Sequence, residues 1–186
     1  MVKIKIIVVG ASQVGKTMLV NFLRKSRVAR YVPTIGVDLQ IHTNKGVEYH
    51  IWDTSGNTSY NHVVRTFFKK ANVLLLVYNN EETFKTVQQL YDTFNTLNEC
   101  NDPSFYLVST NENETSYGAA YAKDEDMIFS TVNTFKPKQV SAFWKRLIVH
   151  MEDRMLQEDW QHGQQQLLPY HGRSSYWCAN WFRWNY

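Results

Sequence analysis

The sequence predicts an α/β fold in which a mostly parallel sheet carries helices on both faces. Three observations lead to this prediction. Strand-like and helix-like segments alternate along the chain, as they do in doubly wound proteins. Residues 73–78, VLLLVY, form a continuous apolar run, which is typical of strands covered on both sides. Residues 10–17, GASQVGKT, form a glycine-containing loop between a β-branched strand and a helical segment.

The strands are predicted from short apolar or alternating segments. In chain order they lie at residues 4–9, 37–43, 47–52, 73–78, 105–109 and 127–129. The second and third alternate apolar and polar side chains on either side of Asn44-Lys45-Gly46, which predicts a β-hairpin. Because helical segments separate the remaining strands, these are expected to run parallel.

The helices are predicted from apolar side chains at helical spacing. A short helix is expected around residues 119–122. The three longer stripes are Met18, Leu19, Phe22 and Leu23; Phe84, Val87, Leu90, Tyr91, Phe94 and Leu97; and Val140, Phe143, Trp144, Leu147, Ile148, Met151 and Met155. These stripes are expected to face the core.

The composition is that of one globular domain. The chain has 186 residues, of which 44% are hydrophobic and 20% charged. Its net charge of +3 is too small to indicate nucleic-acid binding, and no apolar stretch reaches the roughly 18 residues of a membrane span. No signal peptide is expected, because Lys3 and Lys5 interrupt the first apolar run. Cys100 and Cys178 have no metal-binding spacing and favour a reduced, cytoplasmic location.

The loop at residues 10–17 fits the phosphate-binding pattern G-x-x-x-x-G-K-[ST]. Its glycines let the backbone approach phosphate groups, so that several N–H groups point at the anion. Lys16 is expected to reach the terminal phosphates, and the Thr17 hydroxyl to coordinate Mg²⁺. The predicted nucleotide contacts of this loop are Ser12, Gln13, Val14, Gly15, Lys16, Thr17 and Met18.

A second motif, Asp53-Thr-Ser-Gly56, lies at the tip of the second hairpin strand. In a protein with a phosphate loop, such an aspartate holds Mg²⁺ opposite the loop threonine. Thr34 is placed to reach the same metal, and Gly56 to donate its N–H to a γ-phosphate. Each residue alone has an ordinary structural explanation, but together they predict a nucleotide site with Thr17, Thr34 and Asp53 as the metal ligands.

Two further segments complete a known pattern. Residues 31–38, YVPTIGVD, are similar to the first switch of Rab proteins, and residues 51–71 are similar to their second strand and second switch. On these motifs the chain, from residue 3 to about residue 155, resembles the Ras-like small GTPases of the Rab type. The resemblance implies a P-loop NTPase fold, a Ras-like G domain, over residues 1–156. It also implies a switch that binds GDP or GTP with Mg²⁺ and meets effectors, exchange factors and GTPase-activating proteins through both switches.

The resemblance further implies a surface that binds effectors. It would comprise Ile35, Gly36, Val37, Asp38, Leu39, Trp52, Phe67 and Phe68. The alternative for the apolar members is that they pack into the core of the hairpin. For Trp52 both interpretations stay open.

Three positions depart from the family in ways that bear on catalysis and binding. Asn57 stands where the family has a Gln that orients the attacking water. Asparagine is shorter by one methylene, roughly 1.5 Å, and a misplacement near 1 Å costs about 10²-fold in rate. GTP hydrolysis is therefore expected to be slow, with Asn57 and Lys16 as the catalytic residues. Gln13 is bulkier than the usual loop residue, and Arg27 replaces an aromatic residue that stacks on the base.

The loop that recognises guanine is altered most. The family motif Asn-Lys-x-Asp supplies a carboxylate for the N1–H and 2-amino group of guanine, whereas residues 108–114 here are VSTNENE. One alignment keeps Asn111 and offers Glu114 as the acid; the other, without an insertion, places Thr110, Asn111 and Asn113 in the motif. We favour the first, and a loop that recognises no base is a third possibility. The predicted base contacts are Asn111 and Glu114 and, from a later loop, Thr131, Val132 and Asn133.

Residues 157–186 are predicted to form an aromatic-rich tail outside the domain. Rab proteins normally end in prenylated cysteines, but no lipidation motif surrounds Cys178. The tail could lie at a membrane interface, where Trp and Tyr are favoured, or it could be disordered or self-packed. We favour the second, and membrane association stays open.

The predicted function is that of a Rab-like GTP-binding switch, by resemblance in vesicle and membrane traffic, in the cytoplasm or peripherally on intracellular membranes. The first alternative is a pseudo-GTPase interaction module that is locked to one nucleotide or binds nucleotide poorly. The second is a phosphate-loop enzyme such as a small-molecule kinase. The kinase is disfavoured, because the hairpin and Asp53-x-x-Gly56 are typical of a nucleotide switch and no Arg-rich lid segment is evident.

Overall fold

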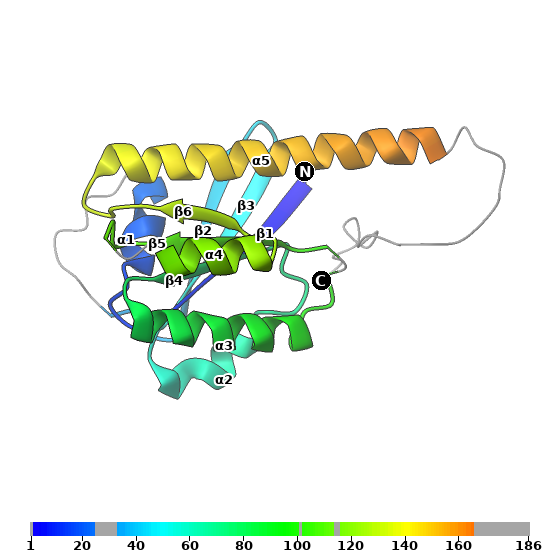
Figure 1. Cartoon of the computed structure of the whole chain (residues 1–186). Coiled ribbons are helices and arrows are strands. Elements are labelled where there is room, and N and C mark those ends of the chain that lie inside the picture. The colour runs from blue at the N-terminus through cyan, green and yellow to red at the C-terminus, as the bar shows by residue number, and fades with distance from the viewer. Residues whose placement is uncertain (1, 25–32, 101, 114–115, 166–186) are drawn as a thin grey trace.

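The computed structural model describes residues 2–24, 33–100, 102–113 and 116–165 (Figure 1). Six strands form one sheet in the order β2-β3-β1-β4-β5-β6. The hairpin strands β2 and β3 are antiparallel, and every other neighbouring pair is parallel. The strands are β1 (Val2–Val9), β2 (Val37–Asn44), β3 (Val47–Thr54), β4 (Val73–Tyr78), β5 (Ser104–Ser109) and β6 (Ile128–Thr131). The predicted α/β class is confirmed.

The helices cover both faces of this sheet. They are α1 (Lys16–Asn21), α2 (Asn61–Thr66), α3 (Glu81–Leu97), α4 (Ser116–Asp124) and α5 (Pro137–Gln165), with short 3₁₀ turns η1 (Phe22–Arg24) and η2 (Thr58–Tyr60). Buried side chains of α1 and α5 pack on one face, and those of α2, α3 and α4 on the other. In Figure 1, α5 runs along one side of the sheet, with α3 and α2 on the opposite side.

Alternation along β1 divides the core in two. Ile4, Ile6 and Val8 pack under α1 and α5, whereas Ile7 and Val9 pack under α2, α3 and α4. All six residues of β4 are buried, as the continuous apolar run predicts for a strand in the middle of such a sheet.

The local elements begin and end for identifiable reasons. Lys45 (φ 45°) and Gly46 (φ 83°) form the hairpin turn, since two positive φ values match the twist of the flanking strands. Asn80 caps α3 by accepting the N–H of Thr83, whose side chain accepts the N–H of Asn80 in return. Such a capping box satisfies two backbone donors of the first turn.

Three predicted boundaries need correction. Thr131 is the last residue of β6 rather than part of a loop, and α4 extends well beyond residues 119–122. The last helix continues past residue 156 to Gln165, because glutamine and glutamate sustain a helix without an apolar stripe. The part of the predicted tail from residue 166 onward lies outside the described residues. Among the described residues, no helix is long and apolar enough to span a bilayer.

Candidate functional site

The site is built on the loop that joins β1 to α1. Gly15 has φ 95° at the start of α1, a conformation that favours glycine. Lys16 is only 5% exposed, and its Nζ donates to the carbonyls of Gly10 at 2.9 Å and Ala11 at 2.7 Å. Burial lowers the pKa of Lys16 to about 8, although Asp53 opposes the shift. The ammonium is therefore held inside the loop, where an incoming phosphate can displace the two carbonyls and favour the charged form.

Three side chains from distant segments meet beside Lys16. Thr17 Oγ1, in α1, donates to Asp53 Oδ2, at the end of β3, at 2.6 Å. Thr34 Oγ1, in the segment before β2, lies 2.9 Å from Thr17 Oγ1 and donates to Asp53 Oδ2 at 3.3 Å. The structure therefore brings the three predicted metal ligands together.

The chemistry of this cluster fits a hard divalent cation. Asp53 is fully buried, and its Oδ1 makes no hydrogen bond with any residue that the structure describes. Burial raises the pKa of its carboxyl, although the Thr17 hydrogen bond and the Lys16 charge act in the opposite direction. A carboxylate and two hydroxyls are oxygen ligands of the kind that Mg²⁺ takes, usually together with substrate phosphates. Thr17, Thr34 and Asp53 would hold the ion, which would neutralise phosphate charge.

Gly56 lies directly against the phosphate loop. A Cβ built at this position would come within 2.3 Å of Ala11 C and of Ser12 N. Any larger residue must push the second motif away from the loop. The close approach places the predicted γ-phosphate donor beside the loop that would hold the phosphates.

Asn57 has a structural role in this arrangement. Its side-chain Oδ1 accepts the N–H of Ser59 at 3.0 Å and so caps η2, while its own N–H donates to Ser55 Oγ at 3.3 Å. The carboxamide oxygen is therefore oriented by the backbone that it caps. Gln13 is exposed and has φ 63°, a strained value for a side chain of this size.

The loop after β5 is tied to the phosphate loop through Thr110. The Thr110 hydroxyl donates to Val14 O at 2.8 Å, with Tyr78 O at 3.2 Å as a second acceptor. Asn111 Oδ1 instead accepts the N–H of Asn113 at 3.1 Å. The residue that bridges the two loops is therefore Thr110. Glu114, the acid of the favoured alignment, lies outside the described residues.

The comparisons with known proteins agree with this geometry. A model of the Ras family matches residues 5–153. The chain belongs to the Ras family. GTP-binding protein YPTM1 of Zea mays is 32% identical over 140 residues, which cover 67% of this chain and 66% of that protein. Ras-related protein SEC4 of Saccharomyces cerevisiae is 31% identical over 117 residues, covering 59% of this chain and 54% of that protein.

A third relative matches a shorter stretch. Ras-related protein RABD2a of Arabidopsis thaliana is 35% identical over 92 residues, covering 46% of this chain and 45% of that protein. The chain thus spans 45% to 66% of the length of these three curated relatives. These similarities support a Rab-like member of the Ras family.

The effector surface expected of a Ras-family member is only partly exposed. Ile35 is 79% exposed and Leu39 38% exposed, whereas Trp52 packs on Phe67 with ring centroids 4.7 Å apart. Phe68 is fully buried against Phe94, so its assignment to this surface is wrong in this structure and it belongs to the core. The other members of the predicted surface, Gly36, Val37 and Asp38, are half-buried.

One polar cluster beside the Ras-family site has no signal in the sequence. Glu112 accepts hydrogen bonds from Lys136, Gln139 and Asn133. These donors lie more than twenty residues further along the chain, and no local spacing signals such a contact.

The predicted role of Arg27 falls outside the described residues.

Proposed function

We propose that this chain is a Rab-like nucleotide switch that binds GDP and GTP with Mg²⁺ at the site described above. The observation that carries the proposal is the cluster of Thr17, Thr34 and Asp53 beside the buried Lys16. The relatives named above include one whose name describes it as GTP-binding, and the resemblance to Rab proteins extends the proposal to vesicle and membrane traffic.

The same contacts give a physical basis for switching. Thr34 lies one residue before Ile35, which is the most exposed of the predicted effector residues in the first switch. Gly36 O accepts the N–H of Ser55 at 2.8 Å, which links the first switch to the second motif. A γ-phosphate with its Mg²⁺ would engage Thr34 and Gly56 together, and its loss would release both loops. Effectors would then distinguish the two nucleotide states through Ile35 and its neighbours.

A second candidate function is a pseudo-GTPase interaction module. It is favoured by the engagement of Asn57 in the cap of η2, which gives this side chain a structural role at the position of the family's glutamine. In that case the chain would bind nucleotide and present its switches without turning over. Hydrolysis rates, rather than binding, separate the two candidates.

The proposal is tested by nucleotide binding to phosphate-loop variants. Lys16→Ala is expected to abolish GDP and GTP binding, and Thr17→Asn to weaken binding of the Mg²⁺–triphosphate most. Lys123→Ala, which removes an exposed lysine of α4, serves as the matched control and should bind as the unmodified chain does. Calorimetric titration of the nucleotide-free proteins measures all three. If Lys16→Ala bound GTP as tightly as the unmodified chain, the assignment of the loop would be wrong.

A further inference from the structure

The strand order gives the direction in which a bound nucleotide would extend from the phosphate loop. Because β3, β4, β5 and β6 all run parallel to β1, the loops that follow them leave from one edge of the sheet, the edge at which α/β proteins bind ligands. Asp53, which accepts from Thr17, lies at the end of β3 on one side of the phosphate loop. The terminal phosphates would therefore lie toward β3, and the nucleoside would extend toward the loops after β5 and β6.

These two loops contact the phosphate loop directly. From the loop after β5, the Thr110 hydroxyl donates to Val14 O at 2.8 Å. The β6–α5 loop comprises residues 132–136, and a Cβ built at Gly15 would lie 3.2 Å from Thr134 Cγ2 in this loop and 3.5 Å from Thr110 Cγ2. The β6–α5 loop thus runs beside the start of α1, where it is placed to receive the nucleoside.

Hydrogen bonds on both sides of Phe135 hold the β6–α5 loop. Asn133 Oδ1 accepts the N–H of Phe135 at 3.0 Å, and the N–H of Asn133 donates to Gln139 Oε1 at 2.7 Å. Lys136 Nζ donates to both Glu112 oxygens at 2.9 Å, and Gln139 Nε2 donates to one of them at 2.9 Å. The hydrogen bonds from Gln139 and Lys136 lower the pKa of Glu112 to about 2, so this carboxylate is charged at neutral pH. The backbone that carries Phe135 is therefore organised before a ligand binds.

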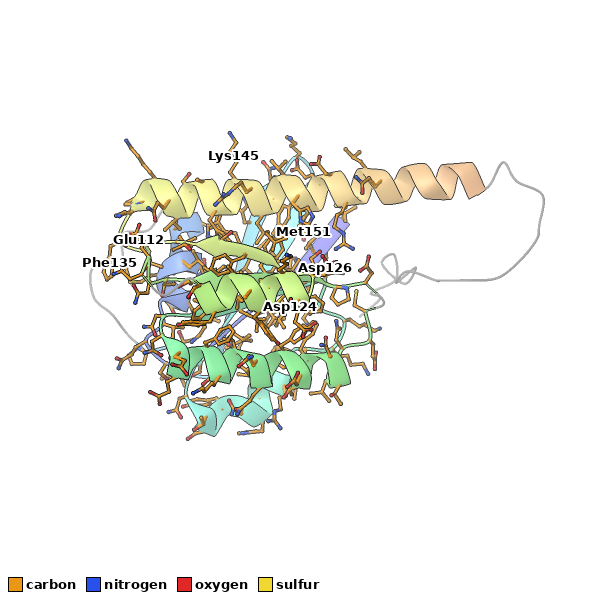
Figure 2. The ribbon with its side chains drawn as sticks, viewed as in Figure 1. Glu112, Asp124, Asp126, Phe135, Lys145 and Met151 are labelled. Carbon is orange, nitrogen blue, oxygen red and sulfur yellow. The ribbon has the colours of Figure 1, made fainter. Side chains whose placement is uncertain are left out.

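The side chain of Phe135 is left in solvent by this arrangement. It is 80% exposed, the highest value among the large apolar side chains that the structure describes. Figure 2 shows Phe135 and Glu112 at the same end of the molecule, where α5 begins. A flat apolar ring on a held loop beside the phosphate loop is suited to a flat ligand group, because every nucleotide base presents a π-face on which an aromatic ring can stack.

We propose that Phe135 stacks on the base of the bound nucleotide and forms the nucleoside subsite of this chain. This inference rests on the proposed function and adds to it a residue that belongs to neither of the two short motifs. Stacking engages the face of the base, so guanine and adenine would gain from it alike. Recognition of the base edge is left to the hydrogen-bonding groups of the surrounding loops.

The test compares GDP with inorganic pyrophosphate, which shares the phosphates and their Mg²⁺ but has no base. The full chain and Phe135→Ala, both freed of nucleotide, are titrated calorimetrically with each ligand in excess Mg²⁺. Loss of one base-stacking aromatic side chain weakens binding by about 5- to 150-fold. We therefore expect the GDP affinity of Phe135→Ala to fall by about tenfold or more, while its pyrophosphate affinity stays that of the unmodified chain.

Two results would overturn the inference and leave the proposed function intact. The first is an unchanged GDP affinity in Phe135→Ala. The second is an equal fall for GDP and pyrophosphate, because that would place the effect in the loop and the phosphate contacts instead of the base. Failure of the unmodified chain to bind GDP contradicts the proposed function and this inference with it.

Variants that keep or remove the ring give an independent measurement. Phe135→Tyr keeps an aromatic ring and should bind GDP nearly as the unmodified chain does. Phe135→Leu keeps an apolar side chain without a ring and should lose most of what Phe135→Ala loses. Leu156→Ala, at a residue of α5 that is 67% exposed, is the matched control and should leave GDP affinity unchanged. The unfolding temperatures without nucleotide check that each variant folds. Full GDP affinity in Phe135→Leu would show that the ring is not needed, and the inference would be wrong.

Discussion

At the scale of single residues, the proposed slow hydrolysis of GTP depends on Asn57. Its side chain is one methylene short of the family's glutamine and its oxygen caps η2. We therefore expect slow intrinsic hydrolysis and an increase of about tenfold or more in Asn57→Gln, if misplacement is the main defect. Asn57→Ala should change the rate little. Single-turnover hydrolysis of bound GTP measures these rates.

In both Asn57 variants, the effect of losing the cap of η2 on stability has to be separated from the change in the hydrolysis rate. Replacing an N-cap asparagine costs about 1 kcal/mol of stability, so the unfolding temperatures of both variants should be recorded. If the unmodified chain hydrolysed GTP at the normal rate for the family and Asn57→Ala lost that activity, Asn57 would be a working catalytic residue. That result would contradict the account of this position.

The burial of Asp53 has a measurable consequence for stability. Burial raises the pKa of its carboxyl, so the folded chain holds this proton more tightly than the unfolded chain. The stability that the Asp53 carboxyl contributes is fully present at pH values below its pKa in the unfolded chain, which is about 3.9. It is lost as the pH rises through the higher pKa that this carboxyl has in the folded chain. At neutral pH the buried carboxylate therefore opposes folding.

Removing this charge should stabilise the free protein while it destroys the metal site. In Asp53→Asn the amide oxygen can still accept from Thr17, so we expect the unfolding temperature in EDTA to rise by about 2–4 °C per kcal/mol gained. Binding of the Mg²⁺–nucleotide should fall sharply in the same variant. A lower unfolding temperature at neutral pH, with the pH dependence unchanged, would contradict the assigned cause.

At the scale of elements, α5 is fastened to α1 through Trp144. This side chain is 2% exposed, and its Nε1 donates to Leu19 O at 2.7 Å. Trp144→Ala should lower the free energy of unfolding by about 3–5 kcal/mol, since it leaves a cavity and removes the hydrogen bond to Leu19 O. Phe135→Ala, at a residue that is 80% exposed, should stay within about 0.5 kcal/mol. Denaturant unfolding compares them, and a loss below about 1 kcal/mol in Trp144→Ala would show that α5 is held elsewhere.

Elements with strong local patterns were predictable from the sequence. The apolar run of β4, the buried stripe of α3 and the phosphate loop each carry their signal within a few residues. By contrast, nothing local distinguishes Phe67, which packs on Trp52, from its neighbour Phe68, which is fully buried. The end of α5 was also missed, because residues 157–165 are mostly polar and carry no apolar stripe from which a helix could be predicted.

The candidate site was likewise predictable where its residues belong to short local motifs, and not where it depends on contacts between distant loops. Lys16, Thr17 and Asp53 belong to two short motifs, and their convergence follows once the strands are parallel neighbours. The contact of Glu112 with Lys136 joins residues 24 positions apart. Its existence depends on how two loops pack, and only the folded arrangement shows it.

At the scale of the whole molecule, the tail sequence bears on membrane association. Residues 166–186 are rich in Trp and Tyr, which favour membrane interfaces, but they lack the sequence pattern of an amphipathic helix. In a flotation assay with vesicles of phosphatidylcholine and phosphatidylserine, we expect the full chain and a chain ending at Gln165 to be recovered with the vesicles in equal fractions. Flotation that is lost on truncation would assign the tail a role at the membrane.

The central claim is that Thr17 and Asp53, joined by Thr34 when a γ-phosphate is present, hold a Mg²⁺ ion that secures a bound nucleotide. Its most direct test is the rate at which GDP leaves the purified protein in excess Mg²⁺ and in excess EDTA. The account predicts that EDTA accelerates release by at least about tenfold, which corresponds to about 1.4 kcal/mol, and that Asp53→Asn releases GDP fast under both conditions. Equal rates for the unmodified chain with and without Mg²⁺ would contradict the claim.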